Sequence, residues 1–244
     1  MLPWDDTIND DATHDDVSAV DELAAAVTAL SVTAKAATIT TTAAAAITTP
    51  KVILCDAGYG FPSEARPRRE KMLAVAKQLV HFLHFQQDKK DKALVKILGC
   101  NQADVATLKA RMEELYKAEL PEHVEFSTEP LNDLAGAMYL SPDAPLVLEP
   151  STDPPSVVIV GMLIDRRVQV DRSHRRANAL QIPSARLALE HFNINDHEPL
   201  NVDVCMEVMQ QWWWNGSGGE PYMRAAEQAL RHHVERHPNR PLHK

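Results

Sequence analysis

The sequence is poor in glycine and cysteine, and it contains no long apolar run. Its 244 residues include only eight glycines, about half the usual share of roughly 7%, so few loops can form glycine-rich phosphate turns. The three cysteines, Cys55, Cys100 and Cys205, stand far apart without CxxC spacing, which argues against a disulfide framework or a cysteine-based zinc site and indicates a reducing compartment. His81 and His84 have no third ligand beside them, so we expect no metal site. No apolar run approaches the roughly 20 residues that span a bilayer, so we expect no membrane segment.

Basic residues are outnumbered by acidic ones, but the excess is confined to one end. The 25 Lys and Arg against 34 Asp and Glu give a formal net charge of -9. Residues 1–50 hold eight of the acids and a single base, Lys35, so the remaining 194 residues are close to neutral at -2. A strongly acidic protein disfavours nucleic-acid binding, but a near-neutral folded part does not exclude it.

The first fifty residues differ in composition from the rest. Residues 1–22 are acidic and polar, and residues 24–49 contain eleven Ala and eight Thr with no large side chains to pack. We therefore expect residues 1–50 to form an acidic, then Ala/Thr-rich arm or linker, or an arm that orders on a partner. The acidic start is the opposite of an Arg-rich mitochondrial presequence, so either no such signal is present or the chain begins at a mature N-terminus.

From Lys51 onward, short apolar runs alternate with amphipathic stretches. Strands are predicted at the mostly apolar stretches Val52–Cys55, Ala93–Leu98, Ala137–Leu140, Val157–Leu163 and Ala185–Leu189, and a short strand at Val124–Phe126. Helical spacing predicts helices from Ser63, as N-cap, to about Phe85, and at Gln102–Leu120, Ser173–Leu180, Val202–Trp214 and Pro221–Glu235. This alternation predicts an α/β domain with a mostly parallel sheet at residues 51–220, followed by a polar C-terminal helix and a basic tail at 221–244.

A short glycine motif follows the first expected strand. Asp56-Ala57-Gly58-Tyr59-Gly60 is similar to the cofactor turn of Rossmann-type S-adenosylmethionine methyltransferases. That fold needs an acidic residue after the next strand to hold the ribose hydroxyls, and Leu98-Gly99-Cys100-Asn101-Gln102 contains none. A plain strand and turn is therefore favoured over a Rossmann site.

A longer set of motifs, collinear over about residues 51–215, resembles a known family. The set consists of Tyr139–Pro145 (YLSPDAP), Ser156–Asp165 (SVVIVGMLID), an arginine-rich helix, Leu180–Leu189 (LQIPSARLAL) and Leu200–Val204 (LNVDV). In this order the motifs resemble the tRNA purine-9 N1-methyltransferase family of the SPOUT superfamily, which includes the methyltransferase-like subunit of mitochondrial ribonuclease P.

The resemblance implies a SPOUT-type α/β fold, with a parallel sheet, helices on both faces and a C-terminal deep trefoil knot. It implies S-adenosylmethionine as the cofactor, held by three loops that map to Leu140–Asp143, Gly161–Arg166 and Leu187–Asn201. The cofactor-binding residues that follow from this mapping are Leu140, Ser141, Asp143, Gly161, Met162, Leu187, Leu189 and Leu200.

The resemblance also assigns a catalytic residue, because Asp165 falls on the family's proposed general base. An acid at a strand end in a water-poor cleft can have its pKa raised into a useful range for taking the proton from purine N1. The alternative is a strand-end aspartate that caps the next turn.

The basic residues of this region and of two further groups are candidates for RNA contacts, or else belong to solvated helix faces. These residues are Arg166, Arg167, Arg172, Arg175, Arg176, Arg69 and Lys89.

We therefore predict an S-adenosylmethionine-dependent methyltransferase that acts on N1 of a purine in tRNA or a related structured RNA. Departures from the family pattern support an alternative: Gly161-Met162 stands in place of Gly-Gly, and Val170-Asp171 in place of Lys-Gly, which puts a Cβ where the family has none. The alternative is a catalytically degenerate SPOUT domain that serves as an RNA- or protein-binding subunit of a ribonucleoprotein, such as a mitochondrial RNA-processing complex or the mitoribosome. A mitochondrial location is expected, with nucleus or cytoplasm as the alternative.

Overall fold

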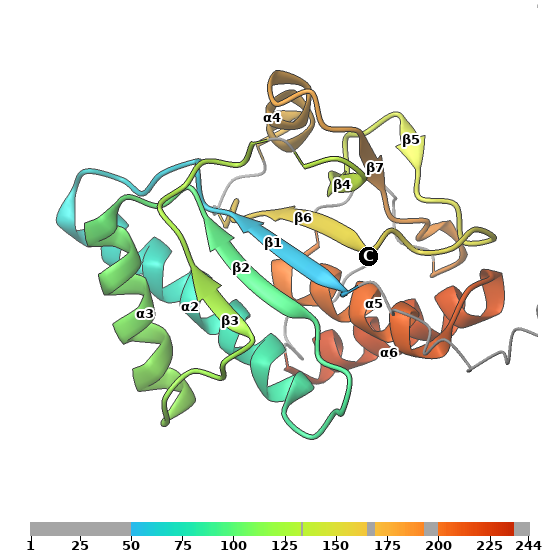
Figure 1. Ribbon diagram of the computed structural model, residues 1–244, viewed down its shortest axis with the longest axis horizontal. Helices are drawn as coiled ribbons and strands as arrows, with labels where there is room; N and C mark the ends of the chain where they lie inside the picture. The colour runs from blue at the N-terminus through green and yellow to red at the C-terminus, as the bar shows by residue number, and fades with distance from the viewer. Residues whose placement is uncertain (1–49, 133, 165–168, 193–199, 237–244) are drawn as a thin grey trace, which may run out of the picture. The chain divides into compact units, whose positions relative to one another are not determined.

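The computed structural model describes residues 50–132, 134–164, 169–192 and 200–236 (Figure 1). Within these ranges, parallel strands form one sheet in the order β3-β2-β1-β6-β4-β7-β5. The strands are β1 (Val52–Asp56), β2 (Leu94–Leu98), β3 (Val124–Phe126), β4 (Ala137–Leu140), β5 (Leu146–Val147), β6 (Val157–Gly161) and β7 (Ser184–Arg186). The helices are α2 (Ala65–Gln86), α3 (Gln102–Tyr116), α4 (Arg172–Ala179), α5 (Val202–Asn215) and α6 (Gly219–Arg236), with a 3-10 turn η1 (Glu190–Phe192). The predicted α/β class with a parallel sheet is confirmed.

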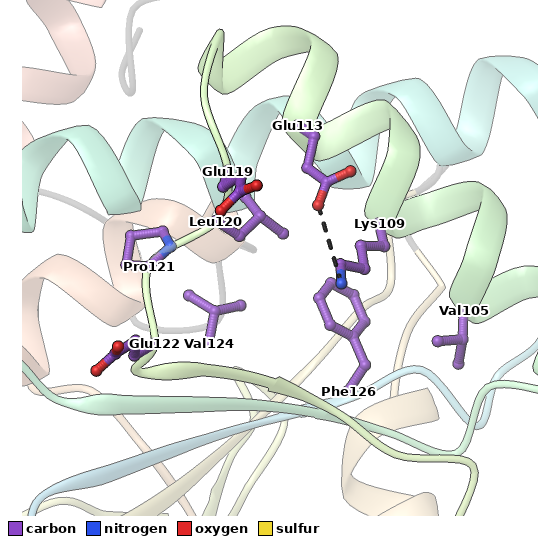
Figure 2. Close-up of a pocket in the computed structure, with 9 residues that line it drawn as sticks. All are labelled: Val105, Lys109, Glu113, Glu119, Leu120, Pro121, Glu122, Val124 and Phe126. Carbon is purple, nitrogen blue, oxygen red and sulfur yellow. Dashed lines mark ion pairs between the residues drawn. The ribbon is translucent and has the colours of Figure 1, made fainter.

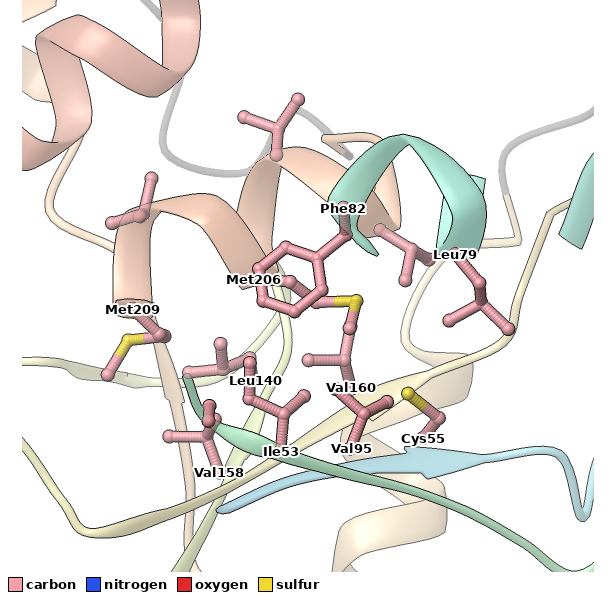
Figure 3. Close-up of a cluster of buried hydrophobic side chains, with 14 of the residues drawn as sticks. Ile53, Cys55, Leu79, Phe82, Val95, Leu140, Val158, Val160, Met206 and Met209 are labelled. Atoms are coloured by element: carbon pink, nitrogen blue, oxygen red, sulfur yellow. The ribbon is translucent and has the colours of Figure 1, made fainter. Parts of the chain in front are cut away.

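Helices cover both faces of the sheet, as Figure 1 shows. Successive side chains of a strand point to opposite faces, so Ile53 and Cys55 of β1 pack under α2, α3, α5 and α6, whereas Leu54 faces α4. Figure 3 shows the larger core, in which Phe82 of α2 and Met206 of α5 lie over the central strands. The central strands are buried on both faces, which explains their continuous apolar sequences.

Several element boundaries differ from those expected. Helix α2 begins at Ala65, and Glu64 rather than Ser63 occupies the N-cap position, without a capping side-chain hydrogen bond. Helix α3 ends at Tyr116 rather than Leu120, because Lys117 adopts a left-handed conformation with φ 61° that closes the helix. Strand β5 and turn η1 were not predicted; the two residues of β5 are too few to show an alternating pattern.

The last helix, α6, belongs to the same core as the residues before it. It was predicted as a polar helix, but a stripe at helical spacing is buried against α5: Tyr222, Ala225, Ala226, Ala229, Leu230 and His233. The hydroxyl of Tyr222 donates a hydrogen bond to the Ala188 carbonyl at 3.1 Å, which ties α6 to the segment after β7.

Parts of the sequence predictions lie outside the described residues. These are nearly all of the N-terminal arm (1–49), Asp165, Arg166 and Arg167, and the basic tail at 237–244. Residues 193–199, which join η1 to α5, also lie outside, and the trefoil knot stays a prediction from the family resemblance.

Candidate functional site

The carboxyl ends of β1, β6, β4 and β7 lie side by side, because these neighbouring strands are parallel (Figure 1). The register pairs Asp56 with Gly161 and Leu140 with both Val160 and Ala185. Strands β2 and β3 extend the sheet on one side of β1 and the later strands on the other, so the order of the chain reverses there. Ligands of open α/β sheets bind at such a reversal, outside the carboxyl ends of the strands. This edge is the candidate site.

The structure gathers the predicted cofactor-binding residues at this edge. Leu140, Ser141 and Asp143 lie at the end of β4, Gly161 and Met162 at the end of β6, and Leu187 and Leu189 just after β7, while Leu200 precedes α5. Four of them, Leu140, Met162, Leu187 and Leu189, belong to one hydrophobic cluster and are 2–7% exposed, and Leu200 packs partly buried against it. The ends of β4, β6 and β7 thus contribute apolar side chains to the same core.

Polar groups join the loop after β4 to the start of α4. The buried hydroxyl of Ser141 lies 2.7 Å from that of Ser173, and it accepts a hydrogen bond from the Asp143 amide at 3.3 Å. The Asp143 carboxylate in turn accepts the backbone N–H of Asp171 at 2.7 Å. These bonds link two of the segments that carry the family resemblance.

Asp171 occupies the position where the family pattern has glycine, and it keeps a glycine-like backbone. Its φ of 60° and ψ of 8° are left-handed, a conformation that costs residues with a Cβ more than glycine. Its carboxylate lies 3.3 Å from the Arg175 guanidinium on the exposed face of α4. The backbone at Asp171 thus has a conformation that favours glycine.

Replacing Asp171 with glycine is expected to stabilise the protein by about 0.5–1 kcal/mol, because relief of the left-handed strain exceeds the added chain entropy and the loss of an exposed ion pair. Urea unfolding measures this change. Asp153→Gly is the matched control, since exposed Asp153 does not have a positive φ and its replacement should destabilise or leave stability unchanged. Equal effects of the two substitutions would contradict strain at Asp171.

A buried hydrogen-bond network follows β1 on the α4 face of the sheet. The Asp56 carboxylate is fully buried and accepts bonds from the Gly58 amide at 2.9 Å, the Tyr139 hydroxyl at 3.0 Å and the Arg176 Nε at 3.0 Å. The Tyr59 hydroxyl lies 2.7 Å from that of Tyr139. A buried carboxylate with three donors, one of which is the cation Arg176, is well compensated. This network therefore anchors α4 to the end of β1.

The two tyrosines stay protonated donors in this network. Burial, aided by the charge of Asp56, raises the pKa of Tyr139 well above its usual range. Burial also raises the pKa of Tyr59 to about 12, although the hydrogen bond with Tyr139 opposes the shift. The hydrogen bond to Asp56 raises the pKa of Arg176. Because the Tyr139 hydroxyl donates its proton to Asp56, the Tyr59 hydroxyl donates to the Tyr139 oxygen. Arg176 is the counter-ion of the Asp56 carboxylate.

Gly161 allows these tyrosines to approach the end of β6. A Cβ at this position would lie 3.0 Å from the Tyr139 hydroxyl oxygen and 3.1 Å from Tyr59. The family resemblance assigns Gly161 to a cofactor loop, and the close approach of the two tyrosines is a second reason for a glycine there. The Asp56–Tyr139–Arg176 network itself was not predicted; the only sequence signal was an aspartate directly after an apolar strand.

The predicted RNA-binding residues fall into separate groups. Arg172, Arg175 and Arg176 lie on α4, where Arg172 and Arg176 also stack over the Tyr59 ring at 5.2 and 5.8 Å. Arg69 is exposed in the first part of α2, which begins near the same edge of the sheet. Lys89 is at the opposite end, where the chain enters β2, and its ammonium lies 5.3 Å from the Trp214 ring. The structure thus does not bring Lys89 to the candidate site.

Within the described ranges, no group of His, Cys, Asp and Glu side chains is arranged to hold a metal ion. In the same ranges, no helix is long and apolar enough to cross a membrane.

Comparison with solved structures identifies the fold. The full-length spTrm10–SAH complex matches with a TM-score of 0.55 at 14% identity, over 74% of this chain and 96% of that one. The structure of spTrm10(74) matches with a TM-score of 0.57 at 14% identity, over 74% and 94%. A dual-specific Trm10 from Thermococcus kodakaraensis gives 0.49 at 13%, over 72% and 99%. The first two likenesses show that the described domain has the α/β fold of those two Trm10 structures.

The comparison of sequences identifies a family, which is more specific than the likeness of folds. Residues 68–224 match the family model for tRNA (guanine(9)-N(1))-methyltransferase TRM10/TRM10A. A comparison with curated proteins gives no significant match. Because the match to the family model covers more than half of the chain, the protein belongs to the TRM10/TRM10A family, as its motifs predicted.

Proposed function

We propose that this protein is an S-adenosylmethionine-dependent methyltransferase that methylates N1 of a purine in tRNA. The observation that carries the proposal is the convergence of three segments, at the ends of β4, β6 and β7, on one edge of the sheet. These segments are the ones that the family resemblance assigns to the cofactor. Membership of the TRM10/TRM10A family supports the reaction class.

The side chains at this edge fit such a cofactor in their chemistry. Leu140, Met162, Leu187 and Leu189 are apolar core side chains at this edge, and apolar side chains suit an adenine ring and a thioether chain; the Ser141 hydroxyl, paired with that of Ser173, lies at the end of β4. S-adenosylmethionine supplies an activated methyl group on a positively charged sulfur when it is bound. The apolar residues exclude water from the reacting atoms, which favours neutralisation of that charge in the transition state.

Asp165 is the proposed general base, on the strength of its position in the family motif, four residues beyond the end of β6. When the purine is guanine, the Asp165 carboxylate takes the N1 proton while N1 gains the methyl group, so one proton moves to the enzyme for each methyl group transferred; N1 of adenine carries no proton and needs no such base. For guanine, this removal frees the N1 lone pair for attack.

The arginine-rich face of α4 is the proposed contact for the RNA backbone. Arg175 is exposed and Arg172 projects beside Tyr59, while Arg69 lies in the exposed first part of α2. Guanidinium groups suit phosphate oxygens, with which they can form two parallel hydrogen bonds. Arg176 acts differently in this scheme, because its ion pair with buried Asp56 positions α4.

One observation favours a second function, that of a catalytically degenerate RNA- or protein-binding subunit. Asp171 places a carboxylate where the family pattern has glycine, next to the loop proposed to hold the cofactor. An acidic side chain there can obstruct the cofactor or repel its carboxylate while the fold persists. The two functions differ in one measurable property, cofactor binding.

Calorimetry with S-adenosylmethionine tests the proposal on the full chain. We expect binding of one cofactor per chain with an affinity tighter than about 1 mM, and competition by S-adenosylhomocysteine but not by ATP. Circular dichroism of the same sample controls for folding. A folded protein that gives no binding heat at this concentration would support the degenerate subunit instead. Asp171→Gly then separates the causes, since restored binding in that variant would identify Asp171 as the obstruction.

A further inference from the structure

The edge strand β3 carries a groove that the proposed methyl transfer does not use. The groove has a volume of about 600 Å³ and lies between β3, α3 and the loop that joins them (Figure 2). We call it the β3 groove. Strands β2 and β1 separate it from β6. Apolar side chains from all three segments line it: Val105, Leu120, Pro121, Val124 and Phe126.

The backbone of β3 is open on the outer side of the sheet. Its inner side bonds to β2, where Val95 donates to the His123 carbonyl at 2.8 Å and Ser127 donates to the Ile97 carbonyl at 2.9 Å. In a parallel ladder the intervening residues direct their N–H and C=O groups to the other side. Within the described ranges no strand pairs there, and only the Val124 amide is engaged, with the Pro121 carbonyl at 2.9 Å. The groups of Phe126 are therefore available to an added strand.

The rim of the groove is acidic. Glu113 reaches down from α3 toward Lys109, 3.9 Å away, as Figure 2 shows. Glu119 and Glu122 flank the other end, are exposed, and form no ion pair with any residue that the structure describes. The rim thus has three carboxylates against one ammonium.

The negative charge of the rim favours one kind of ligand for the β3 groove over the others. Phosphate groups of RNA are repelled, and so is the acidic segment 1–22 of this chain. A second copy that paired β3 with β3 would bring two sets of the same carboxylates together. A basic segment with alternating apolar side chains fits both the rim and the floor, since alternate residues of a strand point to the same side.

We propose that the β3 groove binds an extended, basic and apolar segment of a partner protein, which adds to the sheet as a strand beside β3. The partner's backbone pairs with the open groups of β3, its apolar side chains enter the groove under α3, and its Lys or Arg residues meet Glu119 and Glu122. Such a contact places a protein partner at the edge of the sheet remote from the proposed RNA face.

The probe is a fluorescent synthetic peptide, Lys-Val-Lys-Ile-Lys-Val-Lys, titrated with the full chain by fluorescence anisotropy. Glu119→Lys/Glu122→Lys is expected to weaken its affinity about tenfold or more. The control, Glu227→Lys/Glu235→Lys, makes the same change of net charge on exposed positions of α6 and should change affinity less than about twofold. A peptide with proline in place of the central Ile should bind about tenfold more weakly, because proline cannot donate to β3.

Amide chemical shifts of the protein show where the peptide lies, and the expected changes are in β3 and the start of the loop before it. Equal weakening by both double substitutions, unchanged binding of the proline peptide, or absence of binding by a folded chain would each overturn the proposal. A chain that dimerises in sedimentation, and becomes monomeric in Glu119→Lys/Glu122→Lys, would assign the groove to a second copy instead. None of these results depends on cofactor binding, so they are independent of the proposed enzyme activity.

Discussion

Replacing Arg236 with methionine is expected to destabilise the domain by about 3–5 kcal/mol at pH 8, because it leaves buried carboxylates without their cation. Arg236 lies 2.6 Å from Glu207 and 3.2 Å from Asp203, and both carboxylates are completely buried. Their other partners are histidines, His232 at 2.9 Å from Glu207 and His81 at 3.5 Å from Asp203. The cluster joins α2, α5 and α6, so its loss loosens the last helix from the core.

The loss is expected to shrink as the pH falls toward 5. Burial raises the pKa of Glu207 above its ordinary value, and the charge of Arg236 opposes the shift. Without Arg236 this pKa rises further. A carboxyl group with a raised folded-state pKa contributes stability that is fully present below its unfolded pKa and is lost as pH rises through the folded value. At lower pH, Glu207 is therefore neutral in the variant and no longer needs a cation.

Urea unfolding at pH 5, 6, 7 and 8 measures both effects. Arg231→Met is the matched control on the same helix, because Arg231 pairs with exposed Glu227 at 2.9 Å on the surface. Its loss should stay below about 1 kcal/mol at each pH. A penalty for Arg236→Met that is as small as the control's, or that is constant from pH 5 to 8, would contradict the proposed role.

Replacing Asp165 with asparagine is expected to lower the rate of methyl transfer to guanine by about 10²- to 10⁴-fold, since the amide keeps the shape of the side chain but cannot take the N1 proton. The affinity for tRNA should change less than about twofold, because no phosphate contact is lost. Single-turnover transfer of a labelled methyl group to a tRNA transcript measures the rate, and filter binding measures the affinity.

Asp153→Asn is the control for this substitution. Asp153 is exposed in the segment before β6, at the end of the sheet opposite the candidate site, so the control should transfer methyl groups at the normal rate. If Asp165→Asn also retains a normal rate, Asp165 is not the base. If the two variants lose tRNA affinity equally, the effect is on binding in general and not on proton transfer.

Much of the fold could be predicted because the information is local. The predicted short strands Val124–Phe126 and Ala137–Leu140 coincide with β3 and β4, and the spacing of apolar residues located α2, α3, α5 and α6 within a few residues. The predicted ends of the helices and strands were less accurate, since a single left-handed residue such as Lys117 decides where a helix stops. Periodicity describes only neighbouring residues. The family resemblance added which segments, far apart in the sequence, belong to one site.

The candidate site was predicted in part for the same reason. Motif order placed Leu140, Gly161 and Leu187 in three cofactor loops, and the parallel sheet brings those loops to one edge. Arg176 shows the limit of sequence reasoning. It was counted among the RNA contacts by its neighbours in sequence, yet its guanidinium lies 3.0 Å from Asp56, 120 residues earlier in the chain.

The sequence by itself determined the α/β class, the order of the elements and the family, because periodicity and motif order are properties of the chain alone. Only the tertiary structure decided which charges are paired, because pairing depends on distances between residues far apart in sequence. It paired Arg176 with Asp56 and Arg236 with Glu207, and it left Glu119 and Glu122 at an open sheet edge without a basic partner in the described ranges. Whether a charge stabilises the core or faces a partner follows from those distances, since desolvation makes an ion pair necessary inside and optional at the surface.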